Sequence, residues 1–154
     1  MRSCSKLFTL MVLTVGFGLV QAQGKSNLSG TWKMDAGRSD FGHGPAPDSR
    51  IDRITQDDPR LKDTITQSNR QGEMTYDMNY TTDGKESTNT VRGNHVKSAA
   101  RWEGDELVID SKVGERAEIK DRWSLSPDGK TLTLQRRLVG PMGSTDQKIL
   151  FEKQ

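Results

Sequence analysis

The amino-acid sequence predicts an all-β fold, an up-and-down antiparallel meander of about eight to ten strands that closes into a barrel, either hollow or filled. Strand signals separated by turn residues recur about every ten residues, a spacing typical of sandwiches and barrels. The hairpins follow one another without interruption, which favours an up-and-down barrel over a Greek-key sandwich. No stretch beyond the N-terminal segment shows a sustained helical period, so we expect no long helix.

The expected strands carry alternating polar and apolar residues, and most are joined by tight turns such as Asp83-Gly84 and Gly104-Asp105. Each such strand needs apolar residues on one face only, so a thin core suffices for a barrel. In chain order, the sequence predicts strands over 30–35, 50–57, 60–69, 72–82, 85–92, 95–103, 105–111, 115–125, 130–139 and 145–153.

Two hairpin registers, derived separately, agree on which residues share a face. With residues 93–94 at the centre of one hairpin, Asn89 pairs with Ser98. With residues 83–84 at the centre of the preceding hairpin, Met78 pairs with Asn89. A slip of one residue would turn every side chain to the opposite face, so this agreement supports a real meander. The later turns pair Trp102 with Leu107, Ile109 with Ala117, Trp123 with Leu134 and Asp121 with Arg136.

The first 22 residues have the pattern of a secretory signal peptide. Arg2 and Lys6 precede an apolar run over 7–20, and a small-residue cleavage site ends at Ala22. The run holds about 14 residues, fewer than the ~20 that a membrane-spanning helix needs. We therefore expect cleavage after Ala22, a single domain over 23–154, and a secreted or periplasmic location without a membrane anchor.

Removal of this segment changes both the charge and the cysteine count. The chain has 23 basic and 21 acidic residues, and the loss of Arg2 and Lys6 makes the two numbers equal. A balanced charge argues against nucleic acid as a partner. The single Cys, Cys4, lies in the segment, so we expect no disulfide in the remaining domain.

The face that carries the apolar residues should point into the barrel. If the barrel is hollow, the expected ligand site has an apolar wall and a few polar anchors, as ligand sites usually do. The alternative is a filled barrel, in which Asn89 and Ser98 bond each other. The expected wall residues are Tyr76, Met78, Tyr80, Trp102 and Trp123, and the expected polar anchors are Asn89 and Arg136.

Asp121 and Arg136 are expected to face each other inside the barrel on neighbouring strands. A carboxylate and a guanidinium in this arrangement form a charge-assisted hydrogen bond. One interpretation is a structural ion pair. The other is that Arg136 binds an acidic head group of a ligand while Asp121 orients it.

The connection over 36–49 is longer than the others and rich in Gly and Pro. A loop of this length in a compact domain is usually functional or disordered. It contains Phe41 and His43. Phe41 either closes one mouth of the barrel as a lid or covers the first strands.

Gly30-Thr31-Trp32 opens the first expected strand. This Gly-x-Trp resembles the first signature of the lipocalins and their calycin relatives. The resemblance implies that Trp32 closes the bottom of the barrel beneath a basic residue from a late strand, supplied here by Arg136 or Lys148. The domain as a whole also resembles small exported bacterial proteins described as lipocalin-like, whose function is not established.

No constellation for catalysis, for metal binding or for a cofactor is recognisable in the sequence. His43 and His95 are the only histidines, and no phosphate loop or nucleophile motif occurs. We therefore expect a non-enzymatic exported protein that binds a small apolar ligand. The alternative is a filled barrel that acts as a structural or protein-interaction module of the cell envelope. The sequence leaves the oligomeric state open.

Overall fold

The computed structural model describes residues 24–154, and the expected signal peptide lies outside the described residues. The predicted all-β class and the ten strands are confirmed, and residues 24–154 contain no helix that could span a membrane. The strands are β1 (Gly30–Asp40), β2 (Ser49–Asp57), β3 (Arg60–Asn69), β4 (Gly72–Thr81), β5 (Asp83–Val91), β6 (Asn94–Glu103), β7 (Glu106–Val113), β8 (Ala117–Leu125), β9 (Thr131–Gly140) and β10 (Gly143–Lys153).

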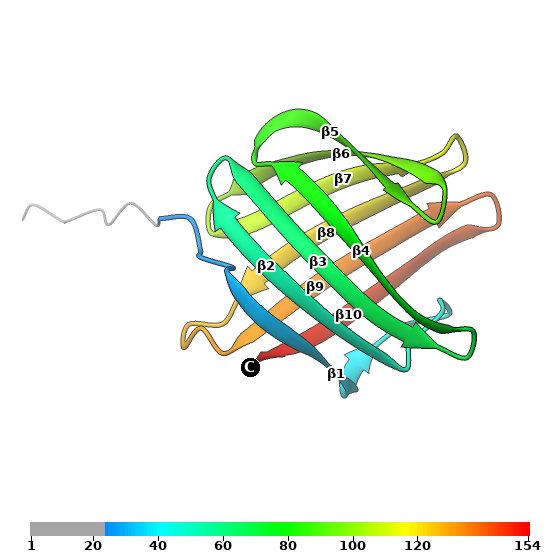
Figure 1. The fold of residues 1–154 in the computed structure, drawn as a ribbon, viewed down its shortest axis with the longest axis horizontal. Coiled ribbons are helices and arrows are strands. Elements are labelled where there is room, and N and C mark those ends of the chain that lie inside the picture. The colour runs from blue at the N-terminus through cyan, green and yellow to red at the C-terminus, as the bar shows by residue number, and fades with distance from the viewer. Residues whose placement is uncertain (1–23) are drawn as a thin grey trace, which may run out of the picture.

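The strands form one antiparallel sheet in the order β4-β3-β2-β1-β10-β9-β8-β7-β6-β5. The pairing of β1 with β10 joins the first strand to the last, with Trp32 opposite Lys153. Figure 1 shows the result, with β1 to β4 crossing in front of β7 to β10. The sheet curls until β4 and β5, its two edges, lie beside each other, and the barrel is nearly closed.

The two ends of the barrel differ in their packing. One end, here called the closed end, holds the start of β1 and the turns that follow β2, β4, β6 and β8. The other, the open end, holds the 41–48 connection and the turns after β3, β5, β7 and β9. The main core lies toward the closed end and comprises Leu28, Trp32, Met34, Ile54, Leu61, Ala100, Leu107, Ile109, Trp123, Leu132, Leu134, Ile149 and Phe151.

Trp32 closes this end, as the Gly-x-Trp resemblance implied. Its side chain is fully buried, and its Nε1 donates a hydrogen bond to the carbonyl of Leu28 at 2.8 Å. The basic residue over its ring is Lys153, with Nζ 5.4 Å from the ring centroid, so the expectation of Arg136 or Lys148 was wrong. The β1–β10 register explains the difference, because it places the end of β10 beside the start of β1.

Several predicted registers are confirmed and others are shifted. The β6–β7 and β8–β9 pairs match the prediction, including Asp121 opposite Arg136. The β5–β6 hairpin instead turns at Arg92-Gly93, both with positive φ, which is the two-residue turn that suits the strand twist. Asn89 therefore pairs with Val96 rather than Ser98.

The β7–β8 loop begins at Gly114 instead of ending there, so Ile109 pairs with Asp121 rather than Ala117. Both shifts move each partner by an even number of residues. Since side chains alternate along a strand, an even shift leaves every residue on its predicted face.

The predicted β4–β5 hairpin ladder was wrong, since within residues 24–154 no backbone ladder joins these strands. The side chain of Asn89 replaces it: Oδ1 accepts from the backbone N–H of Asn79 at 2.8 Å, and Nδ2 donates to its carbonyl at 2.9 Å. Ser87 Oγ accepts from the backbone of Thr81 at 3.2 Å. We call this side-chain connection the β4–β5 seam.

The long connection is shorter than predicted, because β1 continues to Asp40 across an irregularity after Asp35. Phe41 then packs against the main core, and its carbonyl accepts a hydrogen bond from Gln147 Nε2 at 3.1 Å. A Cβ on Gly42 would lie 2.6 Å from the carbonyl oxygen of Asp146. The 41–48 connection therefore lies tightly against β10.

We predict that Asn89→Ala lowers the free energy of unfolding by about 1–3 kcal/mol, because it leaves the backbone groups of Asn79 without partners. Hydrogen exchange should accelerate in β4 and β5. Asn79→Ala is the matched control, because the exposed Asn79 side chain can be removed while its backbone still bonds Asn89. Chemical denaturation should show a change within about 0.5 kcal/mol for the control, and equal losses in both variants would contradict the role of the seam.

Candidate functional site

The barrel interior contains two hollows toward the open end. The inner hollow measures about 230 Å³, and the mouth hollow, beneath the 41–48 connection, measures about 320 Å³. Tyr76, Arg92 and Arg136 line both. The inner hollow is also bordered by a second apolar cluster of Ile65, Met78 and Val96, against which Tyr76, Tyr80, Val91 and Val113 pack.

A group of charged side chains borders these hollows: Arg50 and Arg136 line the mouth hollow, and Asp121 and Arg136 line the inner hollow. Arg50 on β2 binds Asp52 through two hydrogen bonds of 2.7 Å, and the side chains are 4% and 0% exposed. Arg136 on β9 binds Asp121 on β8 in the same way, at 2.8 and 2.7 Å. We call these four residues, together with Asp63 on β3, the charged belt.

Each guanidinium of the belt keeps donors to spare. Nε and Nη2 are used on the paired aspartate, and neither Nη1 has a hydrogen-bond partner among residues 24–154. Within that range, the fully buried side-chain atoms without a partner are Asp63 Oδ1 and Trp123 Nε1, so each Nη1 keeps some accessible surface. The lining of the mouth hollow includes Arg50 and Arg136 together.

Charge pairing outweighs burial in both arginines. Burial opposes the charge of Arg50, but the neighbouring Asp52 holds the pKa of its guanidinium above the usual range. Burial likewise opposes the charge of Arg136, and Asp121 keeps its pKa raised. Both arginines are therefore held as cations by their own aspartates.

Asp63 is the third carboxyl of the belt and lies 3% exposed. Burial and the adjacent Asp52 raise the pKa of Asp63 well above its usual range, and the attraction of Arg50 and Arg136 offsets them only in part. The neutral carboxyl is favoured because an ion here would be buried beside another carboxylate. Burial also raises the pKa of Tyr76 and Tyr80, so both keep a hydroxyl proton.

The predicted site residues fall into two groups. Tyr76, Met78, Tyr80 and Arg136 line the inner hollow, from β4 and β9. The other three lie elsewhere. Trp123 is in the main core, where its ring stacks on that of Phe151 with 5.9 Å between the centroids. Trp102 lies at the closed end and donates a hydrogen bond to Asp58 at 3.3 Å, and Asn89 forms the β4–β5 seam.

Sequence reasoning missed Arg50, Asp52 and Asp63 because it derived no register for the first three strands. The signal was present in the tight turn after β2, across which Asp57 pairs with Arg60. This register puts Ile54 opposite Asp63, and because side chains alternate along a strand, Asp52 lies on the same face as both of them. The hydrogen bond expected between Asn89 and Ser98 in a filled barrel is also absent among the described contacts. Ser98 Oγ instead lies 2.8 Å from Ser111 Oγ.

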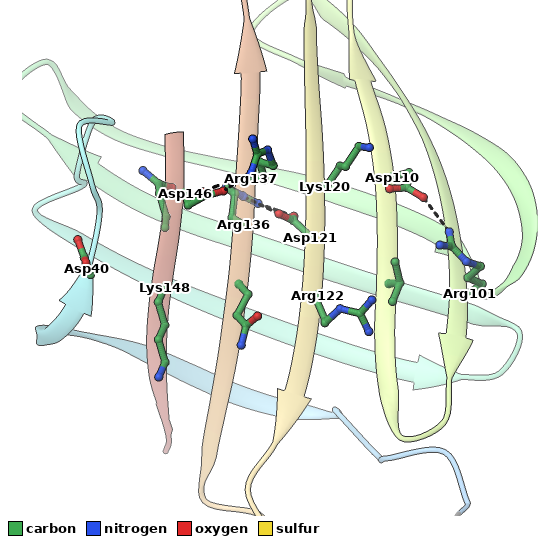
Figure 2. Close-up of a pocket in the computed structure, with 13 residues that line it drawn as sticks. Asp40, Arg101, Asp110, Lys120, Asp121, Arg122, Arg136, Arg137, Asp146 and Lys148 are labelled. Atoms are coloured by element: carbon green, nitrogen blue, oxygen red, sulfur yellow. Dashed lines mark hydrogen bonds and ion pairs between the residues drawn. The ribbon is translucent and has the colours of Figure 1, made fainter. Parts of the chain in front are cut away.

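A larger groove of about 650 Å³ lies mainly over the outer surface of β6 to β10, and Asp121 and Arg136 of the belt also contribute to its lining (Figure 2). Several of its outer charges are paired with each other, as in Arg101–Asp110 at 2.7 Å and Arg137–Asp146 at 3.4 Å. These side chains are about half exposed or more, so the pairs are weak. Across residues 24–154, no group of acidic, His or Cys side chains could hold a metal ion. The candidate site is therefore the interior.

The fold and this interior define a lipocalin-like β-barrel. No family model and no curated protein matches the sequence. Among solved structures, a secretory abundant heat soluble protein from Ramazzottius varieornatus is 18% identical, with a TM-score of 0.66 over 85% of this chain and 97% of that one. The zebrafish ileal bile acid-binding protein complexed with cholic acid is 20% identical, with a TM-score of 0.56 over 82% and 98%.

A point mutant of the REP1-NXSQ fatty acid transporter is 15% identical, with a TM-score of 0.59 over 82% of this chain and 98% of that one. At these identities the likeness establishes the fold. Each neighbour is covered over 97–98% of its own length, so the likeness extends over the whole of each neighbouring barrel.

We predict that Asp121→Ala lowers the free energy of unfolding by roughly 3–5 kcal/mol, because it leaves the Arg136 cation, whose side chain is only 21% exposed, without its partner. Asp146→Ala is the matched control, since it removes the exposed partner of the adjacent Arg137. Its cost should stay below about 1 kcal/mol. Equal, small losses in urea denaturation would show that the Asp121–Arg136 pair is not buried.

Asp63 should make stability fall as the pH rises. An unfolded Asp63 loses its proton near the ordinary pKa of 3.8, whereas the folded one keeps it to higher pH. Above that pH the folded state binds more protons, so the free energy of unfolding decreases by up to ~1.4 kcal/mol per pH unit until Asp63 ionises in the fold. Asp63→Asn should lack this loss and gain stability over the wild type as the pH rises, and parallel pH–stability curves would refute it.

Proposed function

We propose that this protein is an exported binding protein, without enzymatic activity, that holds a small, mostly apolar ligand in the open half of its barrel. The observation that carries the proposal is the inner hollow, bordered by apolar side chains and reached by a few polar groups. This combination is how small-molecule sites are usually built. The ligand would pack against Tyr76, Met78 and Tyr80, with Arg136 as its polar anchor.

The neighbouring structures support this class of function. One is a bile acid-binding protein with cholic acid, and another is a fatty acid transporter. Both are barrels of the same fold that take apolar molecules with a polar group. The inner hollow of this chain, at about 230 Å³, suits a small amphiphile rather than a long double-chain lipid.

The second candidate is a structural or protein-interaction module built on a filled barrel. It is favoured by the packing of the closed half, where the large side chains of Trp32, Phe151 and Leu132 are fully buried. The two candidate functions therefore agree on the packed closed half of the barrel. They differ in whether a ligand occupies the open half.

Native mass spectrometry of the protein purified from an exporting host tests the proposal. We expect an extra apolar mass that is released on denaturation, or uptake of the neutral fluorophore N-phenyl-1-naphthylamine by the delipidated protein. A bare protein mass together with no uptake would favour the filled-barrel module. Sequencing of the purified N-terminus would test export, since cleavage after Ala22 leaves Gln23 first.

A pair of variants assigns the bound molecule to the hollow. Val96 lines the inner hollow, so Val96→Phe should fill the space and abolish fluorophore uptake. Lys97→Phe is the matched control, because the next residue on the strand is exposed on the outer face. Equal uptake by both variants would place the fluorophore elsewhere, and a circular dichroism spectrum of each variant checks that the barrel has folded.

A further inference from the structure

From the charge balance of the belt we infer that the ligand's polar group is a neutral hydrogen-bond acceptor, such as a ketone or ester carbonyl, and not a carboxylate. This inference rests on the proposed function and narrows its ligand class. It also revises the sequence-based interpretation in which Arg136 binds an acidic head group.

The first step is the net charge of the belt. Arg50 forms two hydrogen bonds with Asp52, and Arg136 forms two with Asp121, so each positive charge is already neutralised by one carboxylate. Asp63 adds nothing when neutral and one negative charge when ionised. In either state the belt has no excess positive charge. A carboxylate placed against it would be a buried anion without a counter-ion, which is costly.

The second step is the kind of polar atom that the belt offers. Arg50 and Arg136 line the mouth hollow, and their Nη1 groups are donors without a hydrogen-bond partner among the described residues. Tyr76 and Tyr80 line the inner hollow, and no described residue accepts a hydrogen bond from either hydroxyl. A carbonyl oxygen can accept from such donors and brings no net charge. An ammonium group could donate to the hydroxyl oxygens of these tyrosines, but it would lie beside two guanidinium cations, so it fits poorly.

Among residues 24–154, Arg92 is the one charged residue that lines the two hollows and lies outside the belt. It lies at the tip of the β5–β6 hairpin, is exposed, and lines the rim of both hollows. Solvent weakens its attraction for an anion. Because it could still hold a carboxylate at the rim, the test includes Arg92→Asn, which removes the charge. Asn suits this position because it tolerates the φ of 50° found there.

The experiment compares three ligands with matched chains: decan-2-one, decanoate and decylammonium. Each displaces N-phenyl-1-naphthylamine from the wild-type protein and from Arg92→Asn at pH 7, below the concentrations at which the ligands aggregate. We expect decan-2-one to bind at least about tenfold more tightly than the two ions in both proteins, reflecting the cost of an unbalanced buried charge. Tightest binding of decanoate or decylammonium in either protein overturns the inference.

A charge-removing variant tests the cause. Asp121→Asn leaves Arg136 as an unbalanced cation, so decanoate should gain at least about tenfold relative to decan-2-one. Asp146→Asn on the outer face should leave the ratio of the two affinities unchanged. A ratio that stays at the wild-type value in a folded Asp121→Asn protein also overturns the inference, and if that variant does not fold, the wild-type comparison still decides. If the fluorophore and all three ligands fail to bind, the proposed function itself is wrong.

Discussion

The pairing of β1 with β10 is the constraint on which the rest of the structure depends. It joins β1–β4 to β5–β10 in one continuous ten-stranded sheet, which then curls until its edges meet and encloses an interior. Every polar group on the inner face then has to find a partner or meet a cavity, because water is excluded from the packed parts. The burial of Trp32 and the pairing inside the charged belt both follow from this closure.

The interior has three layers between its two ends. Apolar side chains fill the closed half, the charged belt crosses the middle, and the hollows lie beneath the open end. The main core gives the barrel a hydrophobic anchor that does not need a ligand. The open half can therefore keep empty volume without the whole fold depending on what occupies it. The belt, in turn, gives the hollows a floor that is polar but carries no excess positive charge.

Much of the fold could be predicted from the sequence, because alternation and turn residues fix the strands and their faces. The errors in register at the β5–β6 and β7–β8 turns left every residue on its predicted face, since both shifts were by an even number of residues. The inward Asp121–Arg136 pair was found by this route. The ion pair of Arg50 with Asp52 was missed, because no register was derived for the strands that hold it and the pair joins two residues of one strand.

Other features lie beyond local sequence rules. Lys153 covers Trp32 only because the chain ends meet, and turn chemistry says nothing about that meeting. The division of the expected wall residues also depends on packing: Trp123 and Tyr80 face the same interior, yet one is in the filled half and the other beside a hollow. The alternation of side chains along a strand predicts the face to which each one points, whereas the packing of the whole barrel determines which residues it contacts.

The β4–β5 seam has a consequence for self-association. Two strands that are not joined by a ladder are two sheet edges, and unpaired edges are templates for pairing with another chain. Here each edge faces the other at close range, and Asn89 holds them together through the backbone of Asn79. While the seam is held, each edge shields its neighbour. Loss of that one amide would turn a protected edge pair into a starting point for strand exchange between copies or for aggregation.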